Sequence, residues 1–150
     1  MSSDDVIRIL GLEPLEIEGG HFRETYRCVD PAETPGHSCG TCIYYMIRGD
    51  SVSKWHKVAS DEIWFFHVGS SAEQFLIFED GKREKRILGA DILKGEIPQS
   101  IIPAGTWQFT RLKDQSADSW ALFSAMVCPG FEYEDFVSDD NMPPPQIQSS

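Results

Sequence analysis

The sequence lacks an excess of positive charge: it has 13 Lys and Arg residues against 24 Asp and Glu residues, and a formal net charge of −11. A surface of this kind repels the phosphate groups of nucleic acids and of anionic lipids. We therefore expect no nucleic-acid partner and no membrane partner. A small anionic ligand would bind only where a pocket is locally basic.

Long apolar runs are also missing. No stretch approaches the roughly 18–20 apolar residues that a transmembrane helix needs. Residues 1–20 have neither the basic start nor the apolar core of a signal peptide, so we expect a cytoplasmic protein. A chain of 150 residues is typical of one domain, which we assign to residues 1–140. Residues 141–150, rich in Pro and Ser, are expected to form a disordered tail.

Cysteine is scarce, and only Cys39 and Cys42 stand close together, in a CxxC pair. One interpretation is a redox pair, and another is half of a zinc site that needs Cys28 and Cys128 as well. A third is a set of reduced thiols without a special role, as is usual in the cytosol. The spacing alone leaves all three open.

Helical periodicity is confined to residues 4–10, where Ser3 can cap the helix and Gly11 follows its end. The rest of the chain consists of short β-type runs separated by turns, among them the hairpin signal Asp80-Gly81. This pattern predicts an all-β sandwich or barrel, followed by a C-terminal arm or short helix at residues 129–140. Strands are expected at residues 21–28, 41–48, 51–58, 62–69, 73–80, 82–88, 99–105, 106–112 and 119–128.

The apolar run at residues 62–69 carries two polar residues that an ordinary buried strand would not have, Glu62 and His67. Strand alternation places Glu62, Trp64 and Phe66 on one face. A hairpin through residues 59–61 would set His56 opposite Glu62 on that same face. We therefore expect His56 and Glu62 to share a pocket flanked by the two aromatic rings.

An ionised Glu62 inside a barrel would cost several kcal/mol without a partner. Its partner could be His56 as imidazolium, a metal ion, or a basic residue such as Arg23 or Arg27. The simpler alternative is an exposed or merely salt-bridged Glu62. The opposite face of the strand carries Ile63, Phe65 and His67, and because it is also apolar we expect it to form a homodimer interface.

These residues coincide with two motifs of the cupins. His56, Glu62 and Gly69 match the first His, the Glu and the final Gly of the first motif, and Pro103 and Gly105 match the second motif. Two ligand positions differ from the pattern. Val58 stands at the second His of the first motif, and Gln108 at the His of the second.

Four blocks in order, "EGGHFRETYR", "SDEIWFFHVG", "IPAGTWQ" and "CPGFEYEDF", together resemble the small single-domain cupin-5 family. The resemblance covers about residues 8–137. It implies a β-sandwich jelly roll closed like a small barrel, similar to the fold of cupin-type nucleotide-sugar epimerases, and a homodimer.

A complete cupin site, by this resemblance, offers three His and one Glu to a divalent metal. His56, Glu62 and Gln108 would be the metal ligands left in this chain, able to hold Fe, Mn, Ni or Zn weakly. The sequence therefore permits a metal cofactor without requiring one.

Without a metal, His56 and Glu62 form an acid–base pair suited to proton abstraction beside a carbonyl group. This predicts a sugar or sugar-phosphate isomerase or epimerase. The run "HFRET" is similar to a substrate-binding strand of cupin-type nucleotide-sugar epimerases, which implies that Arg23 contacts an anionic group and Glu24 a hydroxyl. The further candidates for substrate binding are Tyr44, Trp64, Phe66, Gln108 and Thr110.

Loss of two of the four metal-ligand positions is also what a cupin would show if it had retained the pocket but no longer catalysed a reaction. The alternative is therefore a ligand-binding protein of the sensor or storage type with a degenerate metal site. A structural dimer with a vestigial pocket is a third interpretation. The sequence thus leaves open whether the protein is an enzyme, and its expected ligand is a small molecule such as a sugar phosphate or nucleotide sugar.

Overall fold

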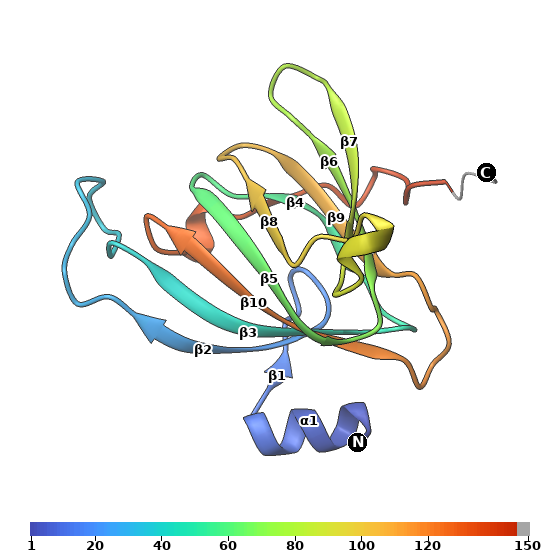
Figure 1. Ribbon diagram of the computed structural model, residues 1–150. Coiled ribbons are helices and arrows are strands. Elements are labelled where there is room, and N and C mark those ends of the chain that lie inside the picture. The colour runs from blue at the N-terminus through green and yellow to red at the C-terminus, as the bar shows by residue number, and fades with distance from the viewer. Residues whose placement is uncertain (147–150) are drawn as a thin grey trace.

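Two antiparallel β-sheets pack face to face in the computed structural model, which describes residues 1–146 (Figure 1). This architecture confirms the predicted all-β sandwich. The first sheet has the order β1-β2-β3-β10-β5-β8: Glu13–Pro14, His21–Arg27, Thr41–Arg48, Trp120–Cys128, Asp61–Gly69 and Gln99–Ile102. The second has the order β11-β4-β9-β6-β7: Val137–Ser138, Ser53–Lys57, Trp107–Leu112, Ala72–Ile77 and Arg83–Leu88.

The helix α1 (Ser3–Leu10) begins the chain below the first sheet, as Figure 1 shows. It starts one residue earlier than predicted, because Ser2 rather than Ser3 is the N-cap. Ser2 and Asp5 bond each other's backbone N–H groups in a capping box. Gly11 ends the helix in the left-handed conformation (φ 67°). Val6 packs with Leu12 and Met46, which fixes the helix to the sheet.

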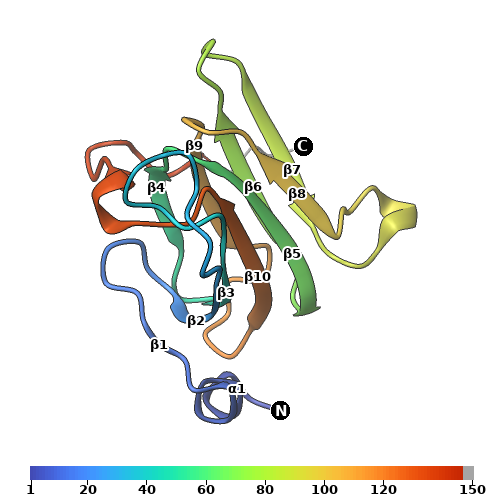
Figure 2. The same ribbon diagram turned by 90° about the vertical axis from the view of Figure 1, so that its left-hand side faces the viewer.

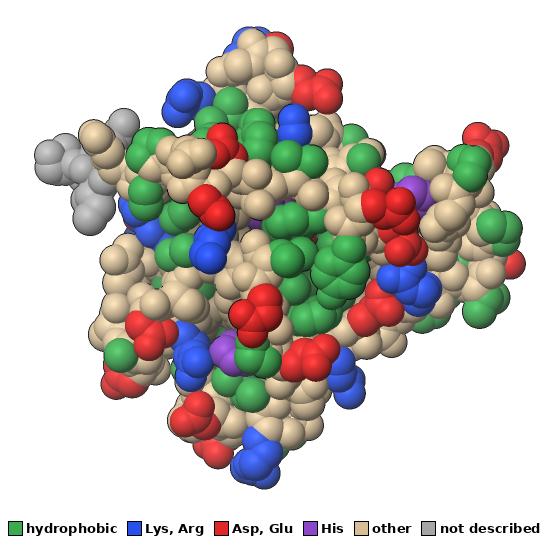
Figure 3. All heavy atoms as spheres, turned by 180° about the vertical axis from the view of Figure 1, so that it is seen from behind, with side chains coloured by type: hydrophobic (Ala, Val, Ile, Leu, Met, Phe, Trp, Pro, Cys, Tyr) green, Lys and Arg blue, Asp and Glu red, His purple; other side chains and the backbone are tan. Residues whose placement is uncertain are grey.

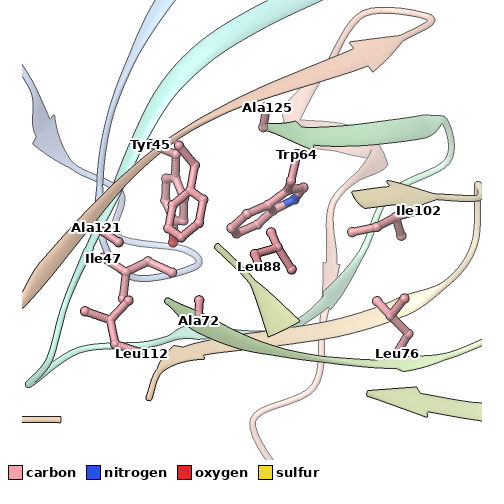
Figure 4. Close-up of a cluster of buried hydrophobic side chains, with 11 residues drawn as sticks. Tyr45, Ile47, Trp64, Ala72, Leu76, Leu88, Ile102, Leu112, Ala121 and Ala125 are labelled. Atoms are coloured by element: carbon pink, nitrogen blue, oxygen red, sulfur yellow. The ribbon is translucent and has the colours of Figure 1, made fainter. Parts of the chain in front are cut away.

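Large aromatic side chains fill the space between the sheets (Figure 4). Tyr45 and Phe123 contact Trp64 edge-on, with ring centroids 5.4 and 5.3 Å from that of Trp64. The indole of Trp64 is only 1% exposed. It therefore belongs to the hydrophobic core and does not flank a pocket as predicted, and Phe66 packs against the same core.

The expected hairpin between residues 51–58 and 62–69 is wrong. Strand β4 pairs with β9 and β11 in the second sheet, whereas β5 pairs with β10 and β8 in the first. The segment 58–60 thus crosses from one sheet to the other. His56 and Glu62 approach the interior from facing sheets rather than from neighbouring strands.

The hairpin at Asp80-Gly81 is confirmed, because β6 and β7 pair along their length and Gly81 has a φ of +86°. Figure 2 shows this hairpin projecting beyond the rest of the sandwich. After β7 the chain makes a short 3-10 turn, η1 (Ile92–Lys94), before it enters β8.

The C-terminal part is an arm with one short turn, η2 (Tyr133–Asp135), followed by the pairing of β11 with β4. Part of the segment expected to be a disordered tail is described. The carbonyl of Pro143 accepts a hydrogen bond from the indole of Trp55 at 3.0 Å, and that of Pro145 accepts one from Arg111 at 2.9 Å. Residues 147–150 lie outside the described residues, so the prediction for them stands untested.

Ile63 and Phe65 are half-buried on the outer face of β5, next to Ile101, which is 55% exposed. The homodimer expected on this face stays a prediction. Figure 3, seen from behind, shows hydrophobic side chains at the middle of the rear face with charged side chains around them. Within residues 1–146, no helix is long and apolar enough to cross a membrane.

Candidate functional site

A cavity of 210 Å³ lies between the sheets at the end next to the C-terminal arm. His56, Val58 and Glu62 line it from β4, the crossing segment and β5, and Glu24 and Arg27 line it from β2. Its apolar lining comes from the first sheet, the loop before β2 and the arm: Leu15, Ile17, Phe22, Ile43, Ala125, Val127, Phe131 and Phe136. The cavity is smaller than the ~300–1,000 Å³ of pockets for drug-sized ligands.

Two larger hollows of 810 and 740 Å³ lie on the outer side of the second sheet, next to the Pro-rich segment. Arg111, which lines both hollows, bonds Glu73 at 3.2 Å and the carbonyl of Pro145. Neither hollow contains His56 or Glu62. The smaller interior cavity is therefore the candidate site.

The imidazole of His56 is fixed on three sides and is 2% exposed. Its Nδ1 lies 2.6 Å from the carbonyl oxygen of Lys54, its Nε2 lies 3.3 Å from Oε1 of Glu18, and the ring stacks on Phe136 with centroids 5.1 Å apart. A carbonyl only accepts, so Nδ1 carries a hydrogen. Nε2 is then the ring nitrogen that faces the carboxylate of Glu18.

Glu18 was not among the residues predicted for the site. It lies in the loop before β2, where its second oxygen accepts a 2.7 Å hydrogen bond from the hydroxyl of Ser53. The next residue must be glycine, because a Cβ on Gly19 would lie 2.2 Å from the carbonyl oxygen of Val52 and φ is +104°. The sequence signal was the block "EGG", whose two glycines mark this close approach.

Glu62 is 8% exposed, and its Oε1 accepts a 2.7 Å hydrogen bond from Nε2 of Gln108. Burial raises the pKa of the Glu62 carboxyl above its ordinary value, and the charge of Glu18 raises it further. The charge of His56 and the hydrogen bond from Gln108 act in the opposite direction. The result is a carboxyl group with raised proton affinity at the wall of the cavity.

The side chains expected to bind a metal do not present a metal site. Gln108 directs its amide nitrogen, not its oxygen, at Glu62, and Nε2 of His56 faces Glu18. Among residues 1–146 no three His, Cys, Asp or Glu side chains come together in a group that could hold a metal ion. Val58, which stands where cupins have a second His, lines the cavity with an apolar surface.

A β-bulge changes which residues of β2 face the cavity. Strict alternation would place Arg23 and Arg27 on one face, but the pairing of β2 with β3 shifts between Glu24 and Tyr26. Arg27 therefore joins Glu24 at the cavity. Arg23 is exposed and lies over the ring of Tyr44, 5.8 Å from its centroid, and neither of these two residues lines the cavity.

The remaining predicted binding residues are structural neighbours of the site. Thr110 is fully buried and accepts a 3.1 Å hydrogen bond from Gln74. Trp64 and Phe66 lie in the core, and Gln108 holds Glu62 without lining the cavity. Of the seven residues predicted for substrate binding, the structure places one, Glu24, on the cavity wall.

The C-terminal arm closes the cavity, a role that the sequence did not reveal. Arg27 donates to Glu132 at 2.9 Å and to the carbonyl of Phe131 at 3.1 Å, while also pairing with Glu24 at 2.7 Å. His37, in the loop before β3, bonds Asp135 and holds the arm from the other side. The hydrogen bond to Asp135 raises the pKa of His37.

The cysteines do not form a cross-link. All four are free: Cys28, Cys39, Cys42 and Cys128. The thiol of Cys39 donates to the carbonyl of Pro31 at 3.2 Å, and burial raises its pKa. A raised pKa keeps the thiol protonated and therefore less reactive, which favours the interpretation of reduced thiols.

Comparison with known proteins identifies close relatives. A family model described as "Cupin superfamily (DUF985)", Cupin_5, matches residues 4–138. The uncharacterized protein YML079W of Saccharomyces cerevisiae is 30% identical over 133 residues, which make up 79% of this chain. This chain spans 66% of the length of that yeast relative, just under two thirds.

Solved structures agree with this assignment. Protein SO0799 from Shewanella oneidensis has a TM-score of 0.85 and 34% identity, and the match covers 93% of this chain and 85% of that one. A hypothetical protein from Leishmania major has a TM-score of 0.82 and 27% identity, over 91% and 86% of the two chains. Oxalate decarboxylase from Bacillus subtilis, at 17% identity and a TM-score of 0.59 over 81% of this chain and 28% of its own, shares the fold alone.

Proposed function

The chain belongs to the Cupin_5 family of the cupin superfamily, and on that premise we propose that its interior cavity carries out acid–base catalysis on a small sugar-like molecule, as an isomerase or epimerase. The observation that supports this most is the pairing of two buried proton-binding groups on one cavity. Glu62 has a raised pKa, and Nε2 of His56 lies 3.3 Å from the carboxylate of Glu18. Groups of this kind cluster at catalytic sites more often than elsewhere.

The reaction that fits is the transfer of a proton between carbon atoms next to a carbonyl group. The Glu62 carboxylate removes the proton from carbon, and His56 donates its Nε2 proton to the carbonyl oxygen, so an enediol forms. Glu18 accepts none of these protons but stabilises the imidazolium that precedes donation. Glu62 then returns its proton to a different carbon, or to the other face of the same carbon, and an enediol hydroxyl gives a proton back to His56. This yields the isomer without any oxidant or reductant.

A raised pKa suits this task because a general base works best when its pKa lies near the operating pH. The apolar walls of the cavity exclude water and keep the carboxyl poorly solvated, which is the main cause of the shift. Gln108 limits the shift by donating a hydrogen bond to Glu62. The two influences together keep Glu62 able to both accept and return a proton.

Substrate size follows from the cavity volume. At 210 Å³ the cavity accommodates one sugar ring or a shorter chain, and it is too small for the base, ribose and two phosphates of a nucleotide sugar. The proposal uses no metal ion, because the side chains at the site are turned toward one another rather than toward a common point.

A screen of aldoses, ketoses and amino sugars, followed by NMR for the appearance of the isomer, tests the proposal. The wild-type protein is expected to convert at least one compound, and Glu62→Gln to lower the rate by at least about 10²-fold. Glu33→Gln is the matched control, because Glu33 is exposed and does not line the cavity. Full activity in the Glu62→Gln variant would show that Glu62 is not the base.

Val58 supports a second candidate, a ligand-binding protein without turnover. Val58 stands at a metal-ligand position of the cupin motif. An apolar residue there is expected in a protein that has lost the ancestral reaction but still binds a ligand in the cavity. This candidate predicts saturable binding of a small molecule and no product. Binding without conversion, with equal affinity in the wild type and in the Glu62→Gln variant, would favour it over the enzyme.

A further inference from the structure

We propose that the ligand of this cavity carries an ammonium group, which lies between Glu62 and Glu132 and is enclosed by the aromatic side chains of the arm. The inference rests on the proposed function and deepens it by naming the class of substrate: a small aminated molecule, such as an amino sugar, rather than a sugar phosphate.

The charges that line the cavity are strongly unequal. Four carboxylates face it, those of Glu18, Glu24, Glu62 and Glu132, against the two basic groups of Arg27 and His56. Even with both basic groups charged, the lining carries an excess of negative charge. An anionic ligand would enter a small, poorly solvated space in which it meets like charges at close range, where screening by salt is weak.

Each basic group already has a carboxylate partner. The guanidinium of Arg27 donates hydrogen bonds to Glu24, Glu132 and the carbonyl of Phe131. His56 has its two ring nitrogens directed at Lys54 and Glu18. A phosphate would have to break these bonds and would leave the carboxylates unpaired, so the sugar-phosphate ligand expected from the resemblance is disfavoured.

Two carboxylates, by contrast, have an oxygen to offer. Oε1 of Glu62 accepts from Gln108 and Oε1 of Glu132 from Arg27, while Oε2 of each forms no ion pair with a Lys, Arg or His side chain within residues 1–146. Glu62 is more than nine-tenths buried and faces the cavity. A buried carboxylate is costly without a cation, so a ligand ammonium that pairs with it gains in affinity.

The walls between these carboxylates are aromatic. Phe22 and Phe131 line the cavity together with Tyr133 and Phe136. Phe131 meets Tyr133 and Phe136 at interplanar angles of 77° and 79°, so their ring planes face in different directions around the cavity mouth. Aromatic faces attract cations with about 0.5–2 kcal/mol each and attract neither phosphate nor carboxylate.

The test compares three probes that share one ring: glucosamine, glucose and glucose 6-phosphate, each titrated into the full chain by calorimetry or NMR. Glucosamine is expected to bind at least tenfold tighter than glucose, and glucose 6-phosphate to show no saturable binding. Glu132→Gln is expected to reduce the ratio between glucosamine and glucose several-fold, whereas Glu33→Gln leaves it unchanged.

Equal or tighter binding of glucose or glucose 6-phosphate would overturn the inference, as would the absence of saturable glucosamine binding. The binding experiment can fail independently of the proposed isomerase or epimerase activity. Preference for glucosamine without isomerisation of any aminated sugar supports the ligand class and contradicts the enzyme. Isomerisation of neutral or phosphorylated sugars, without a preference for amines, supports the enzyme and contradicts the ligand class.

Discussion

The amide of Gln108 donates a 2.7 Å hydrogen bond to the carboxylate of Glu62, across the two sheets of the sandwich. Gln108 stands where the second cupin motif has a histidine, so a position that serves metal binding by the family pattern here serves to hold a carboxylate. The bond favours the ionised form of Glu62 and opposes the effect of burial. The proton affinity of Glu62 is thus raised mainly by burial, and Gln108 is one of the neighbours that lower it.

Removal of that hydrogen bond should raise the pKa of Glu62 further. In Gln108→Leu the ionised carboxylate loses its donor, so the low-pH limb of the activity profile is expected to move to higher pH, with a stability loss of about 1–3 kcal/mol from the unsatisfied group. The measurement is the pH dependence of kcat/KM. Gln115→Leu, on an exposed loop, is the control. If the low-pH midpoint of kcat/KM is the same in Gln108→Leu and wild type, Gln108 does not influence the pKa of Glu62.

Glu62 should make the folded protein less stable as the pH rises. Its pKa is raised above 4.5 on folding, so between pH 4.5 and the raised value the folded state binds more protons than the unfolded state. Stability is therefore present at low pH and lost as pH rises through the folded pKa. The Glu62→Gln variant has no carboxyl group at this position. Its free energy of unfolding, relative to wild type, should therefore increase between pH 4.5 and the raised pKa and stay constant at higher pH.

Urea unfolding of both proteins between pH 4 and pH 8 measures this difference. If the variant instead loses stability relative to wild type as pH rises, the pKa of Glu62 is lowered on folding and the acid–base account of Glu62 is wrong.

A histidine at position 58 should strengthen metal binding at the cavity. Val58 lines the cavity beside His56 and Glu62, so Val58→His adds a nitrogen ligand at the place where cupins have one. We expect at least tenfold tighter binding of Zn²⁺ or Mn²⁺ than in wild type, measured by calorimetry. Val58→Leu is the size control. Equal metal affinity in Val58→His and wild type would show that position 58 does not explain the difference from the family pattern.

Arg27 should control how firmly the arm closes the cavity. Its side chain is 40% exposed, so its ion pairs add only about 0–1 kcal/mol to global stability. It is nevertheless a direct link from β2 to residues 131 and 132 of the arm. Arg27→Gln is expected to leave the unfolding midpoint nearly unchanged while amide hydrogen exchange at residues 131–136 rises several-fold.

Arg8→Gln, which breaks an exposed ion pair on α1, is the matched control for this experiment. Exchange at residues 131–136 that is the same in Arg27→Gln and Arg8→Gln would mean that the stacking of Phe136 on His56, and not Arg27, holds the arm.

The sequence predicted the fold well because strand alternation and turn residues act locally. The hairpin at Asp80-Gly81, the helix before Gly11 and the interior direction of Glu62 all follow from short-range rules. The pairing of strands is not local. A strand that leaves one sheet for the other looks the same in sequence as one that turns back, and so the connection from β4 to β5 was misassigned.

The candidate site was predicted only in part for the same physical reason. His56 and Glu62 were found because polar residues in an apolar run need an explanation. Arg27 and Glu24 both reach the cavity because a β-bulge shifts the register by one residue, and no residue type in "ETYR" predicts the bulge. Glu18 and the arm reach the cavity through loops, whose paths depend on the completed fold.

The central claim is that Glu62 moves a proton on and off a carbon atom of a bound ligand. The most direct measurement is NMR of deuterium incorporation from D₂O at the carbon next to the carbonyl of glucosamine or a related sugar, with wild type, Glu62→Gln and Glu33→Gln. The account predicts catalysed incorporation with wild type and Glu33→Gln, and at least about a 10²-fold loss with Glu62→Gln. Incorporation at the same rate in all three proteins, or in none while the ligand binds, would contradict it.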